Sequence, residues 1–450
     1  MRIGRREGLA VAIGFVLVGA AFVLPRLNLG IKPRSDIGLE RFATRAGAAP
    51  IFGYWDAHVG WGTAPAVLTA VAVVAWGPVV AHRLPWRVLT LSTWATAAAW
   101  AFSLAMIDGW QRGFAGRLTT RDEYLWQVPG IADIPATLRT FTSRILDFQP
   151  NSWVTHVSGH PPGALLTFVW LDRIGLRGGG WAGLVCLLVG SSAAAAAVLI
   201  AVRVLASEQM ARRTAPFVAV APTAIWIAVS ADGYFAGVAA WGIALLAVAV
   251  HGATRFPALV AAGAGLLLGW GVFLNYGLVL IVLPGMAVLA AADWRPVLRA
   301  LGPAVLAALV VAVSFAVAGF SWFDGYTLVQ QRYWQGIAKD RPFGYWSWAN
   351  LACVVCAIGL GSVAGLSRVF DRAAISRRSG CHLLLLAVLA AIALADLSML
   401  SKAETERIWL PFTIWLTAAP ALLPPRSHRL WLAVNAAGAL LLNSIIFTNW

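Results

Sequence analysis

The sequence TRDEYL at residues 120–125 and the sequence SGHPPG at residues 158–163 bound the most polar segment of this chain. The segment contains two adjacent carboxylates, several arginines, two histidines and a Pro-Pro pair, whereas the sequence on either side is mainly apolar. Apolar runs of about 20 residues cross a bilayer as helices. We therefore interpret residues 120–163 as the floor of an active site at a membrane surface, and the rest of the chain as its scaffold.

The composition predicts an all-α, polytopic membrane helix bundle. Of the 450 residues, 60% are hydrophobic and only 12% are charged, and the mean hydropathy is +0.76. A soluble domain contains roughly half apolar residues. The net charge of +15 comes from arginines that lie mostly in short loops between apolar runs, as in the cytoplasmic loops of membrane proteins. We expect contact with membrane lipids and no nucleic-acid partner.

About thirteen apolar runs are long enough to span the membrane. They cover residues 8–24, 64–82, 87–106, 180–204, 215–230, 233–250, 257–273, 277–292, 300–319, 346–366, 381–399, 407–424 and 428–446. A further run at residues 161–176 is shorter and ends in Asp172-Arg173. The later basic loops share one side of the membrane with the earlier ones only if this run does not cross. We expect it to form a half-helix or a tilted surface helix that starts at the outer face.

Arginine placement predicts the orientation of the chain in the plasma membrane. The first run follows Arg2, Arg5 and Arg6 and precedes no cleavage site, so we expect an uncleaved helix with a cytoplasmic N-terminus. The basic loops expected inside are residues 82–87, 203–213, 295–299, 368–378 and 426–429. The loops expected outside are residues 25–63, 107–160, 320–345 and 401–407. The polar segment therefore belongs to the outer face.

Asp122 and Glu123 are the candidate catalytic acids. Adjacent side chains on a helix point about 100° apart, so one carboxylate can face a site while surrounding residues hold the other. Burial near a membrane surface raises the pKa of a carboxyl group, which suits a general base. The alternative is a helix start, with Thr119 or Thr120 as the N-cap and the acids in the first turn.

His160 is the candidate binding residue at the end of the segment. The two prolines that follow it fit the first turn of a helix, so His160 is expected just outside that helix at the membrane surface. It could bind a carboxylate, a phosphate or a sugar. His156 precedes it by about one helical turn and shares the site in this interpretation. The alternative is a purely structural role for both histidines.

Cations on the outer side form a second candidate group. The only lysines in the chain are Lys32, Lys339 and Lys402, and all three fall in loops expected outside. This placement favours an anionic ligand, with headgroup contact as the alternative. The neighbouring candidates are Arg332, Arg341, Glu404 and Arg407. An arginine at the start of a membrane helix is usually paired, so a phosphate clamp and an ion pair with Glu404 both remain open.

Asp232 lies in an Asp-Gly sequence between two apolar runs, where it is either a turn residue or part of the site. Asp36, Asp56 and Asp396 are further acids expected near the outer face.

The four cysteines include a Cys353-Val-Val-Cys356 pattern, which we interpret as apolar packing because no metal-ligand partner is close in sequence. No Walker A loop, dinucleotide fingerprint or HExxH sequence occurs. We expect no resident cofactor, and metal-ligand spacing gives no support for a divalent ion.

Taken in order, these features resemble the GT-C superfamily of integral-membrane glycosyltransferases. An apolar run is followed by an outer loop with Asp122-Glu123-Tyr124, then by His160-Pro161-Pro162-Gly163 and a short apolar helix, and later by Asp232 before another run. This order is similar to the mannosyl- and aminoarabinose-transferase branch. The resemblance covers roughly residues 87–250. It divides the chain into two extra N-terminal spans at 1–86, a core at 87–250 and C-terminal helices at 251–450.

The resemblance implies a polyprenyl-phosphate sugar as the donor and a cell-envelope glycan or glycolipid as the acceptor on the outer face. It implies that Asp122 is the first candidate for the catalytic base and Glu123 the second. It also implies that His160 shapes the site and that cations on the outer side hold the donor phosphate. The chain departs from the family in its extra acidic loop at 25–63, so Asp36 and Asp56 compete with Asp122. The competing function is a transporter or flippase of lipid-linked sugars, which broken helices and internal repeats would favour.

Overall fold

The computed structural model describes residues 4–27, 29–34 and 47–449, and it is mainly helical. The helices of the N-terminal half are α1 Arg5–Val23, α2 Thr63–Arg83, α3 Trp86–Ala105, α4 Tyr124–Gln127, α5 Ile134–Arg139, α6 Thr155–Gly159, α7 Pro162–Arg173, α8 Gly179–Ser192, α9 Val198–Leu205, α10 Glu208–Ala219, α11 Ala224–Ile227 and α12 Ala231–Val250. Those of the C-terminal half are α13 Pro257–Val272, α14 Val282–Ala290, α15 Trp294–Val317, α16 Trp322–Gln335, α17 Phe343–Ile358, α18 Leu360–Leu366, α19 Arg372–Ser376, α20 Gly380–Leu397, α21 Thr405–Ile408, α22 Leu410–Leu416 and α23 His428–Ile445. The strands β1 Gly53–Trp55 and β2 Ile446–Thr448 pair antiparallel.

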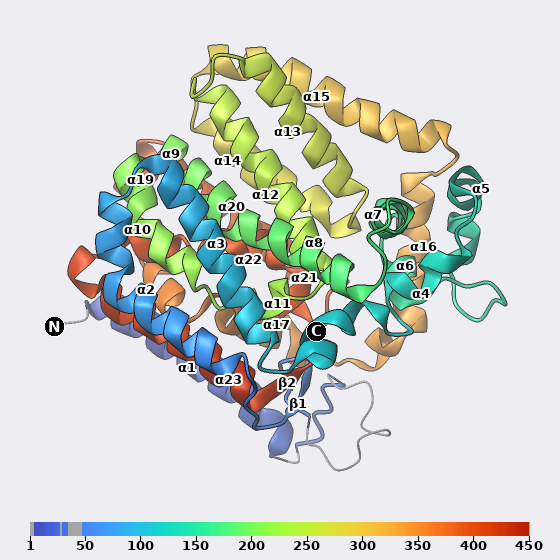
Figure 1. The fold of residues 1–450 in the computed structure, drawn as a ribbon, viewed down its shortest axis with the longest axis horizontal. Coiled ribbons are helices and arrows are strands. Elements are labelled where there is room, and N and C mark those ends of the chain that lie inside the picture. The colour runs from blue at the N-terminus through green and yellow to red at the C-terminus, as the bar shows by residue number, and fades with distance from the viewer. Residues whose placement is uncertain (1–3, 28, 35–46, 450) are drawn as a thin grey trace.

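Seven helices in the described part of the chain are long and apolar enough to cross a membrane. They are Arg5–Arg26, Thr63–Arg83, Trp86–Ala105, Gly179–Leu205, Ala231–Val250, Trp294–Val317 and Gly380–Leu397. The most buried is α12, which packs against α8, α9, α13 and α22 at the centre of the bundle (Figure 1). The chain is therefore a multi-pass membrane protein with a helical core.

The expected count of about thirteen spans is not confirmed, because several apolar runs are broken or short. The run at 215–230 divides into the end of α10 and the single turn α11. The run at 346–366 is bent by 108° between α17 and α18, where Gly359 has a positive φ of 79°. This left-handed conformation is one that glycine adopts readily. The apolar helices Pro257–Val272, Tyr276–Ala290 and Leu410–Leu422 are shorter than the seven long spans.

Helix α7 is short for a membrane span, and the expectation that residues 161–176 do not cross stays a prediction. Its twelve residues extend about 18 Å, well short of a hydrocarbon core of about 30 Å. At its far end, the Arg173 guanidinium donates to the carbonyl oxygen of Ala132 at 2.8 Å, and Ala132 belongs to the polar segment. At its start, Pro161 is the extended N-cap and Pro162 is the first helical residue. Both ends of α7 therefore lie on the same side of the bundle.

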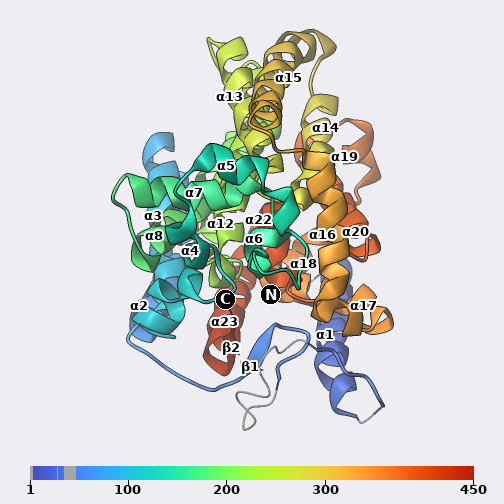
Figure 2. The ribbon, with the colours of Figure 1, turned by 90° about the vertical axis from the view of Figure 1, so that its right-hand side faces the viewer.

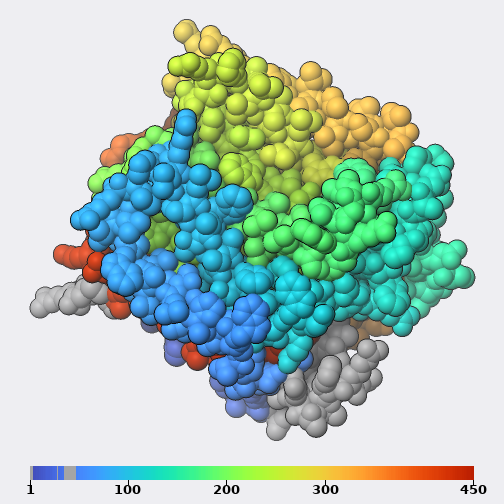
Figure 3. All heavy atoms as spheres, viewed as in Figure 1, coloured from blue at the N-terminus to red at the C-terminus, as the bar shows by residue number. Residues whose placement is uncertain are grey.

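The basic loops gather on one side of the bundle and the polar segments on the other. Arg212 donates to the carbonyl oxygens of Ala81 and Leu84 at 2.7 and 2.8 Å, and Arg368 pairs with Glu7 at 2.6 Å. On the opposite side α4 to α7 lie beside α16, to the right in Figure 1 and facing the viewer in Figure 2. The teal and cyan surface of this segment is seen in Figure 3. This sidedness agrees with the predicted loop grouping, while the cytoplasmic N-terminus stays a prediction.

Candidate functional site

The two ends of the polar segment dock onto each other at the start of α6. The Thr155 hydroxyl donates to Asp122 Oδ1 at 2.9 Å, and the backbone N–H of His156 donates to the carbonyl oxygen of Asp122 at 3.0 Å. The Nδ1 atom of His156 lies 2.9 Å from Oε1 of Glu123. Three contacts thus hold the acidic pair against two consecutive residues of α6.

Asp122 and Glu123 have opposite environments. The Asp122 side chain is exposed, whereas Glu123 is buried at 4% exposure. Neither residue lies in a helix, because α4 begins at Tyr124 and Glu123 is its extended N-cap without a capping hydrogen bond. The alternative interpretation, a helix start with both acids in the first turn, is therefore wrong. The extended backbone places the two side chains in different directions, one toward solvent and one toward His156.

The buried Glu123–His156 contact is an ionic pair. Burial alone would raise the pKa of Glu123, but the positive charges of His156 and Arg407 outweigh it, and the net pKa is lowered. Burial alone would lower the pKa of His156, but the Glu123 carboxylate outweighs it, and the net pKa is raised. Each group therefore favours the charged form of the other. With its carboxylate held in this way, Glu123 is suited to orient His156 rather than to accept a proton.

His160 stays neutral at the entrance to α7. Its Nδ1 atom lies 2.8 Å from both the Tyr124 hydroxyl and the carbonyl oxygen of His156. Burial lowers the pKa of His160 to about 4. A carbonyl oxygen only accepts, so Nδ1 carries the proton and Nε2 is left as an acceptor. A neutral imidazole in this tautomer can accept a hydrogen bond from a substrate hydroxyl.

A second group of charged side chains lies around Arg407. Arg407 Nη1 contacts Asp232 Oδ2 at 2.6 Å and Arg407 Nη2 contacts Glu404 Oε2 at 3.3 Å. The other oxygen of Glu404 contacts Arg341 Nη2 at 2.8 Å. Asp232 is not in an exposed turn, as the Asp-Gly sequence allowed, but is 1% exposed in the first turn of α12. Its Oδ1 atom has no hydrogen-bond partner among the described residues.

Lys402 closes this group toward the surface. Its Nζ donates to the carbonyl oxygen of Arg341 at 2.9 Å, and Arg341 Nη1 donates back to the carbonyl oxygen of Lys402 at 2.5 Å. The ammonium group also lies 4.6 Å from the Trp334 ring centroid. Lys402 and Arg341 are both 5% exposed. These cations are therefore bonded within the protein and are not free to bind a ligand directly.

The two groups act on each other electrostatically. Arg407 helps to lower the pKa of Glu123, and Glu404 helps to raise the pKa of His156. Asp232 acts on His160, whose ring also lies 5.4 Å from that of Phe235 on the same helix turn as Asp232. Residues from the 120–163 segment, from the start of α12 and from the 401–407 segment thus converge in one site.

The remaining candidates occupy different places. Arg332 on α16 reaches the site, because its Nε donates to Ser158 Oγ of α6 at 3.3 Å, and it also pairs with Asp147. Lys339 is exposed and makes no side-chain hydrogen bond or ion pair with the other described residues. Asp56 lies apart, with its Oδ2 3.4 Å from Arg112 Nη2. Asp36 lies outside the described residues.

The sequence interpretation missed three residues that hold the site together. Thr155 fixes Asp122, Tyr124 bonds to His160, and the Tyr333 hydroxyl accepts from the backbone N–H of Lys402 at 3.0 Å. Thr155 was adjacent to His156, and Tyr124 was adjacent to the acidic pair, so proximity in sequence was the available signal. Nothing in the sequence linked Tyr333 to Lys402.

The part of the chain that the structure describes contains no group of three or more His, Cys, Asp or Glu side chains placed to hold a metal ion. Cys186, Cys353, Cys356 and Cys381 are free thiols. The chemistry proposed below uses the side chains of the site.

No protein-family model and no curated protein sequence matches this chain. Its structure is similar to that of the Archaeoglobus fulgidus oligosaccharyltransferase. For the complex with Zn and sulfate the TM-score is 0.52 at 14% identity, covering 79% of this chain and 53% of that one. For the apo form the TM-score is 0.52 at 12% identity, covering 81% and 57%. This chain has a GT-C-like fold.

A weaker likeness is found to ArnT from Cupriavidus metallidurans in the apo state, with a TM-score of 0.47 at 17% identity over 76% of this chain and 60% of that one. The chain spans little more than half the length of the oligosaccharyltransferase structures. At these identities the likeness shows the fold, and the activity has to be argued from the site.

Proposed function

We propose that this chain is a membrane glycosyltransferase that moves a sugar from a polyprenyl-phosphate donor to a hydroxyl group of a cell-envelope glycan or glycolipid. The observation that carries the proposal is the convergence of an exposed carboxylate, a buried Glu–His pair and a neutral histidine at one side of a GT-C-like bundle. Glycosyl transfer needs a base for the acceptor hydroxyl and positive potential for the leaving phosphate.

Asp122 is the proposed base. Its carboxylate is exposed to an incoming acceptor, and one oxygen is fixed by Thr155 at 2.9 Å while the other remains open to the acceptor. It takes the proton of the acceptor hydroxyl as that oxygen forms a bond to the anomeric carbon. The bond between the anomeric carbon and the phosphate oxygen breaks, so the electron pair leaves with the polyprenyl phosphate and the sugar configuration is inverted.

Cations around the site stabilise the phosphate that departs. Arg332 is the half-buried cation beside α6 and feels the charge of Asp122, so it is placed to contact the donor. Arg407 and Lys402 are bonded within the protein and contribute through their positive potential. Glu123 orients His156, and Nε2 of His160 accepts from a sugar hydroxyl. In this assignment Lys402 and Arg407 do not contact the donor phosphate directly, as the sequence interpretation proposed. They act on it only through the electrostatic potential of their positive charges.

The test is transfer by the purified protein in proteoliposomes with radiolabelled polyprenyl-phosphate sugars and an extract of envelope glycolipids. We expect the label to move to the extract and unlabelled polyprenyl phosphate to accumulate in equal amount. Arg332→Gln should reduce the rate about 10- to 100-fold, because one charge-assisted contact to the phosphate is lost. Lys339→Gln, which removes an exposed charge of the same outer segment, should leave the rate unchanged.

A transporter or flippase of the same lipids is the second candidate, because the 108° bend between α17 and α18 is the kind of broken helix that transporters use. Against it, the charged residues of the site gather on one side of the bundle rather than at the midplane. The same proteoliposomes distinguish the two functions. A flippase would move the intact donor between leaflets without any release of polyprenyl phosphate.

A further inference from the structure

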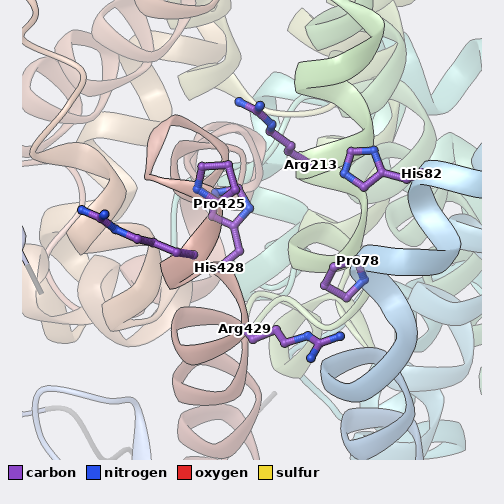
Figure 4. A pocket seen from close by; sticks show the side chains of 7 residues that line it. Pro78, His82, Arg213, Pro425, His428 and Arg429 are labelled. Atoms are coloured by element: carbon purple, nitrogen blue, oxygen red, sulfur yellow. The ribbon is translucent and has the colours of Figure 1, made fainter. Parts of the chain in front are cut away.

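A basic cavity lies on the side of the bundle opposite the candidate site, where the loops rich in arginine gather. Its volume is about 300 Å³, and it lies between α2, α10 and the start of α23 (Figure 4). The lining residues are Pro78, His82, Arg213, Pro425, Arg426, His428 and Arg429. We call it the basic cavity below. None of the residues that we assign to glycosyl transfer lines the basic cavity.

The lining of the basic cavity consists of arginine, histidine and proline side chains. Five of its seven residues are Arg or His, and no carboxylate lines it. In the described part of the chain, Arg213, Arg426 and Arg429 have no ion pair and no side-chain hydrogen bond. Figure 4 shows His82 and Pro78 on α2 facing His428 and Arg429 on α23. The charges of Arg213 and His82 both act on His428.

The neighbouring Arg212 has a structural role, and its guanidinium group is hydrogen-bonded within the protein. Its guanidinium bonds to Glu208 at 2.7 Å and to the carbonyl oxygens of Ala81 and Leu84. Arg213 is next in the sequence and lines the basic cavity, and it has no such partner among the described residues. The positive-inside rule accounts for arginines on one membrane side, but it does not require arginines of α10 and of the start of α23 to line the same cavity. Arginines that line one cavity without a carboxylate among the lining residues favour the binding of an anion.

We propose that the basic cavity binds a phosphate group, either the headgroup of an anionic phospholipid or a soluble phosphate. Arginine guanidinium groups match phosphate oxygens in geometry and charge. Basic pockets between membrane helices bind acidic lipid headgroups. The volume of about 300 Å³ is at the lower end of the range of ligand pockets, so one phosphate-bearing headgroup fits. This proposal does not depend on the proposed transferase activity.

The experiment titrates the purified full chain, in a neutral detergent, with fluorescent phosphatidylglycerol, with fluorescent phosphatidylcholine and with inorganic phosphate at matched ionic strength. Arg429→Gln removes an exposed arginine of the basic cavity, and Arg87→Gln is its matched control because Arg87 is an exposed arginine of the same side that does not line the cavity. A single lost contact of about 1 kcal/mol near a membrane surface corresponds to about fivefold weaker binding. Arg429→Lys should restore most of the affinity.

Each outcome has a definite meaning. Tighter binding of phosphatidylglycerol than of phosphatidylcholine, weakened in Arg429→Gln and unchanged in Arg87→Gln, supports the proposal with a lipid as the source. Saturable binding of inorganic phosphate without preference for phosphatidylglycerol, weakened by the same variant, supports it with a soluble source. Equal affinity for both lipids without phosphate binding overturns it, as does an equal loss in both variants. Because Arg429 is exposed, misfolding of this single variant is not expected.

Discussion

Asp122 and Glu123 are neighbours in sequence, yet burial gives them separate roles. Asp122 is exposed and bonded to Thr155, whereas Glu123 is buried and bonded to His156. A buried carboxylate that loses its charge partner is destabilising, while an exposed one changes little. Stability and activity should therefore respond differently to the two substitutions.

Glu123→Gln should lower the free energy of unfolding by about 1.5–3 kcal/mol, the usual contribution of a hydrogen bond to a charged group. The measurement is chemical or thermal unfolding of the detergent-purified variants. Asp122→Asn is the matched control, and its change should stay below about 0.5 kcal/mol because the side chain is exposed. Equal losses in the two variants would contradict the division between a buried and an exposed acid.

The Glu123–His156 pair also predicts a pH dependence. The lowered pKa of Glu123 adds stability that is present above its usual value of 4.5 and is lost as the pH falls through the lowered value. The raised pKa of His156 adds stability that is complete below its usual value of 6.5 and is lost as the pH rises through the raised value. Both contributions are complete between pH 4.5 and 6.5.

The difference in unfolding temperature between the wild type and His156→Gln should therefore be largest near about pH 5.5 and smaller near about pH 9. It is measured by thermal unfolding of both proteins across this range. Equal differences at both pH values would show that His156 contributes only packing or a neutral hydrogen bond.

At the scale of elements, the contact between α6, α7 and the end of α13 positions the histidines. Gly163, in the first turn of α7, packs so closely that an added Cβ would lie 2.5 Å from the carbonyl oxygen of Phe273. Gly159, at the end of α6, has open space at the same position. The two glycines flank His160 and offer a matched pair of substitutions.

Gly163→Ala should displace α7 and lower both the unfolding temperature and the rate of sugar transfer, because overpacking a tight contact typically costs about 1–3 kcal/mol. Gly159→Ala should leave both quantities nearly unchanged. Thermal unfolding and the transfer assay check the pair. A harmless Gly163→Ala would mean that α7 is free to move without disturbing His160.

Much of the element layout could be predicted from the sequence, and the failures have physical causes. The long, continuous apolar runs of α1, α2, α3 and α12 predict spans because lipid or core surrounds them. Gly359 breaks another run because its φ is positive and because it packs closely against Asn435. A Cβ atom added at Gly359 would lie 2.5 Å from the side-chain oxygen of Asn435. That contact joins residues far apart in the sequence, so composition alone does not report it.

The candidate site was predictable where its residues lie close in sequence. Glu123, His156 and His160 share one segment and come together as expected, and they could be chosen because polar side chains are rare in this chain. Of the two carboxylates that pair with Arg407, only Glu404 was predicted from the sequence. Glu404 is three residues away, but Asp232 is separated from Arg407 by 175 residues and is brought to it by the packing of α12 against α21.

At the scale of the whole molecule, the division into a basic side and the side of the candidate site predicts which loops face the outside of the cell. Lys339 lies on the side of the candidate site and Arg377 on the basic side, and both are exposed. The native Cys186, Cys353 and Cys381 are buried and Cys356 is half-buried, so the labelling of the unsubstituted protein is measured as the background.

Lys339→Cys should react with a membrane-impermeant maleimide in intact cells, whereas Arg377→Cys should react only after the membrane is permeabilised. Labelling followed by gel detection gives the result directly. The reverse pattern would place the candidate site on the cytoplasmic side and contradict the predicted orientation.

The central claim is that the exposed carboxylate of Asp122 drives sugar transfer at the outer face. The most direct measurement is the transfer of radiolabelled sugar from polyprenyl-phosphate donors to envelope acceptors in membranes that contain the wild type, Asp122→Asn or Asp56→Asn at equal amounts of folded protein. We predict a loss of about 100-fold or more for Asp122→Asn, as expected for a general base, and a near-normal rate for Asp56→Asn. A normal rate for Asp122→Asn, with activity lost in Asp56→Asn, would place the base in the 25–63 loop and contradict this account.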